Sequence, residues 1–233
     1  MDRFLTQQAP ADQCPGKGSA RRALPFLLRL AVAAALAALV PARGRALDVV
    51  EQDQPSLDAG ARLIDGKAAV LDNLAAAVGF PSTGNSWLLA GGGATITPGP
   101  VRAQVSAWEG SLSANAGGRS TGWNLGLAAL TIEQSYPMGA FLVTAGTSIE
   151  AAQLEGSFIE AGQLTGVQAP LFGTSIQAGV RWPAHTKLGF FLRGGWEWLS
   201  GGGTWHGPLA PILGSTQFEL GGPTATLQAE LSF

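Results

Sequence analysis

The chain has 233 residues, of which only 13% are charged and 33 are glycine. Soluble domains carry charge on about a quarter of their residues, so this composition argues against an ordinary soluble domain. After residue 46 there are seven Lys and Arg against fourteen Asp and Glu, and 7 − 14 gives a net charge of −7. Nucleic acid is therefore not expected as a partner, because phosphate binding needs clustered basic residues.

Residues 1–46 have the pattern of a secretory signal peptide. Arginines precede an uninterrupted apolar run of eleven residues, 30–40, and small residues lead up to Ala46. Such a run is too short for a bilayer, which needs ~20 residues, so we expect cleavage after Ala46 rather than a membrane anchor. The single cysteine, Cys14, lies ahead of that site, so no disulfide or thiol chemistry is expected in the mature chain.

Residues 47–84 form a candidate periplasmic segment with a seven-residue repeat. A spacing of seven predicts an amphipathic helix over 56–78, lying on a membrane or packed on a neighbouring element. Ser56 can cap its start, and Gly79 with Pro81 can end it. An alternative interpretation makes residues 70–80 a first strand. The apolar stripe consists of Leu57, Ile64, Leu71 and Val78.

The last ten residues alternate strictly between apolar and polar side chains and end on an aromatic. A period of two places the two sets on opposite faces of a β-strand. This ending resembles the C-terminal strand of bacterial outer-membrane β-barrels, and the resemblance implies a signal read by the barrel-assembly machinery. The residues that carry it are Leu227, Ala229, Leu231 and Phe233.

Seven further strands are expected upstream, because the period changes to two from residue 85 onward. The short repeat of Ile149-Glu150 as Ile159-Glu160 suggests a hairpin that turns at residues 155–157. The alternation slips at Trp108, which we interpret as a bulge. The expected strands are 86–97, 102–114, 120–133, 140–153, the second hairpin arm at 159–164, 172–182 and 188–198.

The strands at 172–182 and 188–198 have one apolar face that ends in aromatics and one polar face. This is the pattern of a strand with lipid on one side and a polar lumen on the other. The candidate lipid-interface aromatics are Trp182, Trp196, Trp198 and Phe233.

These observations predict an all-β fold, an eight-stranded antiparallel transmembrane β-barrel over 85–233, preceded by a signal peptide and a short amphipathic helix. The chain resembles small outer-membrane barrels of the OmpA/OmpX type. That resemblance implies a Gram-negative outer membrane, contact with its lipid, insertion by the barrel-assembly machinery and two periplasmic termini. The segment 200–214 becomes the longest outer loop, with four apolar residues over the barrel mouth: Trp205, Leu209, Ile212 and Leu213.

Charged residues on the expected inner face are candidates for a lumen network. An eight-stranded barrel is only wide enough for its own side chains, so these charges are expected to pair and fill the lumen. A narrow gated path is the alternative. The candidates are Arg102, Glu150, Glu160, Arg181, Lys187, Arg193, Glu197 and Glu230.

Catalytic chemistry has little support in the sequence, and no catalytic residue is assigned. His206 lies near Ser200, Ser215 and Glu197 in sequence, a composition similar to lipid A-modifying barrel enzymes, but no family motif surrounds it. His185 lies in a short turn, and two distant histidines make no metal site. No cofactor is expected. We expect a structural or surface-interaction role, with a channel for small or apolar solutes and a lipid A-modifying enzyme as alternatives.

Overall fold

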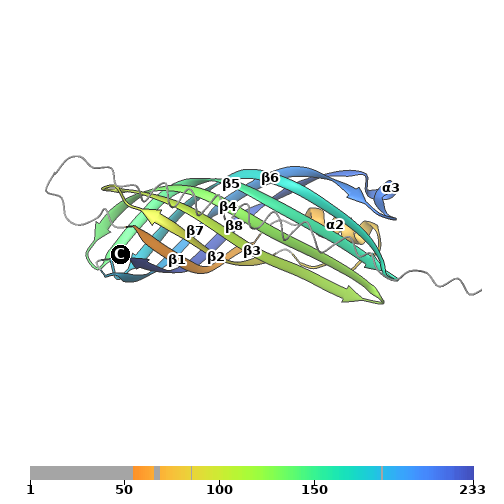
Figure 1. Cartoon of the computed structure of the whole chain (residues 1–233), viewed down its shortest axis with the longest axis horizontal. Coiled ribbons are helices and arrows are strands. Elements are labelled where there is room, and N and C mark those ends of the chain that lie inside the picture. Colours follow the sequence, from red (N-terminus) through yellow and green to blue (C-terminus); the bar gives the residue numbers. More distant parts are fainter. Residues whose placement is uncertain (1–54, 66–68, 85, 185) are drawn as a thin grey trace, which may run out of the picture.

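The computed structural model describes residues 55–65, 69–84, 86–184 and 186–233. Within these residues eight antiparallel strands close into one barrel in chain order, which confirms the predicted fold class. Helices α2 and α3 lie at one end of the barrel and the C-terminus lies at the other (Figure 1). No helix among the described residues is long and apolar enough to cross a membrane. The elements are β1 (Ser56–Asp65), α2 (Ala69–Ala77), β2 (Ser86–Ile96), β3 (Val101–Ala116), β4 (Arg119–Met138), β5 (Phe141–Glu160), β6 (Gln163–Trp182), β7 (Leu188–His206), α3 (Ala210–Leu213) and β8 (Ser215–Ser232).

The first strand corrects the expected helix over 56–78. Residues Ser56–Asp65 pair with β2 on one side and β8 on the other, so the barrel begins at Ser56 rather than at residue 85. This segment also alternates with a period of two, with Asp58 and Arg62 buried and Leu57 outside. Pairing satisfies the backbone groups of β1 and removes the open edges of β2 and β8, which outweighs the heptad pattern. The predicted signal peptide lies outside the described residues.

Gly60 shows why part of the heptad segment is better suited to the sheet. A Cβ atom on this residue would lie 2.0 Å from the carbonyl oxygen of Leu227 on β8. A glycine in a helix costs about 1 kcal/mol, whereas here it permits close approach of two strands.

The second half of the predicted helix is helical, as α2. Gly79 has a φ of 74° and ends it as expected, and the amide of Phe80 donates to the carbonyl of Ala75 at 2.8 Å. Leu71 and Ala75 are fully buried against the barrel interior. The apolar face of α2 therefore packs against the barrel's own core, whereas Leu57 of the predicted stripe lies outside.

The predicted hairpin at residues 155–157 is wrong. β5 runs unbroken through this segment to Glu160, and the turn is formed by Ala161 and Gly162, with φ values of 49° and 78°. There is consequently no separate strand at 159–164. The number of strands is eight as expected, because β1 replaces the missing one.

The predicted bulge at Trp108 is also wrong. The register of β3 against β4 is continuous from Arg102, opposite Glu133, to Trp108, opposite Leu127. Trp108 lies on the same inward face as Arg102 and is 5% exposed. What changes at Trp108 is the chemistry of the lumen, from polar to apolar.

The expected long loop at 200–214 is shorter than predicted, because β7 extends to His206. The connection to β8 contains the single turn α3. Trp205 is buried, Leu209 and Leu213 pack against the core, and Ile212 is 73% exposed. Three of the four apolar residues thus cover the interior of that end.

The strands differ in length, and this divides the barrel into two halves. β1 and β2 have 10 and 11 residues, close to the ~9–11 that cross a bilayer, while β3 to β8 have 16 to 20. We call the half that contains β1 and β2 the belt half. The protruding half is the part of the barrel that extends beyond the ends of β1 and β2 nearest to α2. In the protruding half β8 has no β1 partner before Thr224, and β3 has no β2 partner after Glu109.

Candidate functional site: the filled lumen

Charged side chains occupy the lumen of the belt half. All nine are buried, with exposed fractions of 8% or less, and they come from seven different strands. Since barrels of eight strands are only wide enough for side chains, this set fills the cross-section. The cations are Arg62, Arg102, Arg181 and Arg193, and the acids are Asp58, Glu133, Glu150, Glu197 and Glu230.

Arg62 of β1 holds two carboxylates together. Its Nη2 atom donates to Glu150 Oε1 on β5 at 2.9 Å and to Glu197 Oε2 on β7 at 2.6 Å. Both carboxylate side chains are fully buried, and Ser148 Oγ donates to Glu150 at 2.8 Å. Three strands that are not neighbours are thereby connected across the barrel.

Glu133 of β4 is the centre of a second cluster. Arg193 Nε and Nη2 donate to its two oxygens at 2.9 and 3.2 Å, and Gln177 donates at 3.1 Å. The Nε atom of Arg102 lies 3.8 Å from the same carboxylate. Arg193 also lies over the ring of Phe191 at 3.7 Å, which is the distance of a cation–π contact.

Glu230 of β8 accepts from Arg102 Nη2 at 2.5 Å and lies 3.0 Å from Arg181 Nε. Arg181 also donates to the carbonyls of Pro183, Ala184 and Thr186 at 2.7 to 3.0 Å. This arginine therefore fixes the β6–β7 turn as well as the network.

Asp58 completes the network from the closing strand. It accepts from Gln104 Nε2 at 2.6 Å and from Gln228 Nε2. Gln228 also accepts from Arg193, so the amide connects Asp58 to the Glu133 cluster.

Six of the eight predicted lumen residues lie in this network, and two lie elsewhere. Glu160 shares the inward phase of Glu150 but lies ten residues farther along β5, at the rim, where it pairs with Arg119 at 2.7 Å. Lys187 is exposed beside the β6–β7 turn. Glu160 is at the rim because β5 extends past the charged lumen, and Lys187 is exposed because it precedes the first residue of β7.

Three charged members were missed from the sequence. Asp58 and Arg62 were assigned to a helix, although their spacing of four also fits one face of a strand. Glu133 was placed at the end of a strand without an assigned face. Its inward phase follows from Thr131 and Ser135, polar residues two positions to either side.

The lumen of the protruding half is apolar and aromatic. Phe158 stacks on Trp205 with ring centroids 5.1 Å apart and contacts Phe80, which follows α2, at 4.9 Å. Trp123 meets Phe158, Trp205 and Phe218 edge-on at 5.9 to 6.3 Å. The α2 segment thus contributes to a hydrophobic core inside the barrel.

Rim contacts hold the end of the α2 segment in place. Arg119 Nη1 donates to the carbonyl of Gly79 at 2.8 Å, and Thr121 Oγ1 donates to the carbonyl of Pro81 at 2.8 Å. The guanidinium of Arg119 also lies 5.5 Å from the ring centroid of Phe80. Two side chains of β4 therefore join this segment to the wall.

The candidate lipid-interface aromatics are all exposed on the outside, at 41 to 56%. Trp182 is at the turn end of β6, while Trp196 and Trp198 are near the protruding half. From Phe172 to Trp182 β6 advances about ten residues, which at about 3.3 Å per residue and a tilt of about 40° rises ~25 Å. This is the height of the apolar band of an outer-membrane barrel.

The residues of the proposed assembly signal lie on the outer face of β8. Leu227, Leu231 and Phe233 are 45 to 58% exposed, and Ala229 lies between the two leucines on the same face. Gln228 and Glu230 alternate with them toward the lumen.

The four residues considered for catalysis do not form one cluster. Ser215 lies opposite Thr204 of β7 and so comes near His206, but Glu197 and Ser200 do not. Glu197 faces the lumen, whereas Ser200 faces outward and His206 lies at the rim. Ser200 and His206 are separated by about 20 Å of extended strand. His185 lies outside the described residues, and within those residues no group of three or more His, Cys, Asp or Glu could hold a metal ion.

A closed antiparallel barrel of eight strands, with apolar side chains outside and a filled polar lumen, has the fold of the small outer-membrane barrels. No protein-family model and no curated protein matches this sequence. Several solved structures share the fold, among them the following two. The crystal structure of Neisserial surface protein A is 10% identical and matches 77% of this chain and 97% of its own, with a TM-score of 0.53. A major outer membrane protein from Thermus thermophilus is 9% identical and matches 78% of this chain and 100% of its own, with a TM-score of 0.51.

Proposed function

We propose that the protein is an integral outer-membrane barrel with a structural or surface-interaction role, whose lumen is closed and whose protruding half stands outside the cell. The observation that carries this proposal is a reversal of polarity at one height of the wall. Below it the outside is apolar and the inside charged; above it the outside is polar and the inside aromatic. Both arrangements are favourable together only if lipid surrounds the lower part of the barrel and water surrounds the upper part.

In this proposal both termini are periplasmic, and lipid surrounds the belt half. The barrel-assembly machinery inserts the chain, guided by its terminal strand.

Single cysteines test the orientation, because the mature chain is expected to have no other. Ser113→Cys, on the outer wall of the protruding half, should react with a membrane-impermeant maleimide in intact cells. Lys187→Cys should react only after the outer membrane is opened. The reverse pattern would contradict the orientation.

A closed lumen is favoured over a channel, because four arginines are held between carboxylates that fill the barrel. Purified protein in planar bilayers should give no stepwise conductance. Folding of the same sample is checked by the faster electrophoretic migration of unheated protein. Regular conductance steps that change in Arg193→Ala would instead favour the channel.

The role is also proposed to be non-enzymatic. This is supported by the position of Glu197, which faces the lumen, whereas His206 and Ser215 are exposed at the far end of the strands. Lipid A from cells with and without the protein should have the same mass spectrum. A change in acylation that disappears in His206→Ala would favour the enzyme.

A further inference from the structure

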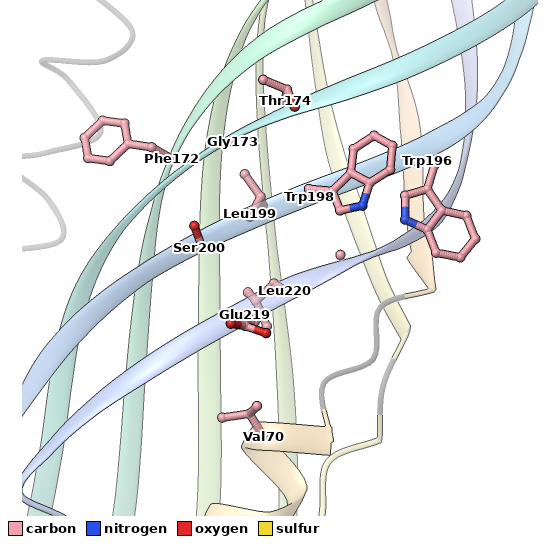
Figure 2. Close-up of a pocket in the computed structure, with 11 residues that line it drawn as sticks. Val70, Phe172, Gly173, Thr174, Trp196, Trp198, Leu199, Ser200, Glu219 and Leu220 are labelled. Carbon is pink, nitrogen blue, oxygen red and sulfur yellow. The ribbon is translucent and has the colours of Figure 1, made fainter.

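A groove of about 520 Å³ crosses the outer wall where the belt half meets the protruding half (Figure 2). Its lining comes mainly from three neighbouring strands and includes the outward-facing Phe172 of β6, Trp196, Trp198 and Ser200 of β7, and Glu219 of β8. Val70 of α2 borders it at the free edge of β8. Its volume is within the range of small-molecule sites, which is about 300–1,000 Å³.

The register of the strands forms this groove. Trp198 lies between Thr174 on β6 and Gly221 on β8, so a large ring has small neighbours on both sides. A Cβ atom on Gly221 would lie 2.5 Å from the carbonyl oxygen of Glu197, so a side chain there would require the backbone to shift. The depression is therefore a property of the backbone and not of one rotamer.

The lining has an apolar part and a polar end. Phe172 and Trp198 are 66% and 49% exposed, and their rings form walls of the apolar part. Ser200 and Glu219 lie side by side at the end toward the protruding half. Neither has a side-chain hydrogen bond or ion pair within the described part of the chain, and no basic residue lines the groove.

We propose that this groove binds one amphiphile with an alkyl chain and a cationic head. The chain lies along Trp198 and Phe172, and an ammonium group meets the Glu219 carboxylate with Ser200 as a hydrogen-bond partner. The charge of Glu219 favours a cationic head group on the ligand, because an unpaired carboxylate attracts a cation and repels an anion. Exposed aromatics at the edge of an apolar belt suit a ligand that is apolar at one end and wet at the other.

This proposal names a class of ligand for the surface-interaction role. Only the idea that the ligand comes from the membrane rests on the proposed function. Binding is measured on folded protein in a nonionic detergent, so it does not depend on the cellular orientation. If the cysteine labelling contradicts the orientation, this binding measurement still decides the site.

The probes are chain-brominated dodecylammonium and chain-brominated dodecyl sulfate, each titrated at equal mole fraction in the micelle while tryptophan fluorescence is read. Bromine quenches nearby indoles, and the ammonium probe should reach half-quenching at about a fivefold lower mole fraction than the sulfate, the effect expected of one exposed charge pair. Trp196 and Trp198 both line the groove, with ring centroids 6.4 Å apart, so changing both to Phe should remove most of the saturable quenching.

Two matched carboxylates decide the role of charge. Glu219→Gln should weaken ammonium binding about fivefold, whereas Glu109→Gln, an exposed carboxylate on β3 outside the groove, should leave it unchanged. Ser200→Leu should weaken both probes by filling the groove. Equal binding of the two probes, an equal effect of the two glutamine variants, or unchanged quenching when both Trp196 and Trp198 are changed to Phe would each overturn the proposal. Unheated electrophoretic migration confirms that every variant is folded.

Discussion

Strands β3 to β8 run through both the belt half and the protruding half, but the two halves carry their apolar side chains on opposite sides of the wall. On β4, Leu130 and Ile132 face outward while Thr131 and Glu133 face the lumen. A few residues earlier on the same strand, Leu127 and Trp123 face the lumen. The phase of the strand does not change; the side of the wall that carries apolar residues does. This is the change expected under the proposed membrane placement, in which lipid surrounds the belt half and water surrounds the protruding half.

The two halves also differ in how they are closed. In the belt half all eight strands pair, so every edge is satisfied. In the protruding half β1 and β2 end early, and the α2 segment packs against the aromatic core there. Stability should accordingly depend on buried charge pairing in one half and on packing in the other.

The largest effect is expected from breaking the charge network of the belt half. Glu133→Ala leaves Arg193 and Arg102 buried without this partner, which should lower the free energy of unfolding by about 3–5 kcal/mol. Guanidinium unfolding of the folded barrel in detergent measures it. The matched change Glu109→Ala, on the outer wall, should stay within about 0.5 kcal/mol. Similar losses in both variants would argue against a stabilising lumen network.

A nearly equal loss is expected from the aromatic core of the protruding half. Phe158→Ala removes the ring between Phe80 and Trp205 and should cost about 3–4 kcal/mol. Because α2 packs against this core, protease cleavage within residues 66–86 should become faster in this variant and not in Glu133→Ala. If both variants are cleaved alike, the two halves do not act separately.

The outer wall gives the third comparison. Leu192→Lys places a charge on the lipid face of the belt half and should cost about 2–4 kcal/mol in lipid vesicles. Ser113→Lys places the same charge on the outer wall of the protruding half, where water solvates it, and should be nearly neutral. Unfolding in vesicles compares them, and equal costs would mean that the belt ends elsewhere.

The smallest effect is expected at the rim. Glu160→Gln removes the exposed ion pair with Arg119 and should change stability by less than about 1 kcal/mol, with a difference that shrinks further at high salt. The same unfolding titration at two salt concentrations measures it. A loss as large as that of Glu133→Ala would show that the rim pair is coupled to the core beneath it.

The sequence alone determined the fold class, the outward face of the last strand and most of the lumen cations, because a period of two reports the two faces of a strand directly. It left the first strand hidden, since Ser56–Asp65 satisfies both a period of two and a period of seven. The strand is favoured because it pairs with the edges of β2 and β8, which would otherwise be open. These two strands lie about 30 and 160 residues away along the chain, so the local sequence does not reveal the pairing. Tertiary structure also explained the change of pattern at Trp108. Alternation along a strand shows that its two faces differ, but it does not show which face is exposed to water. In the proposed placement, that depends on where along the barrel the lipid ends.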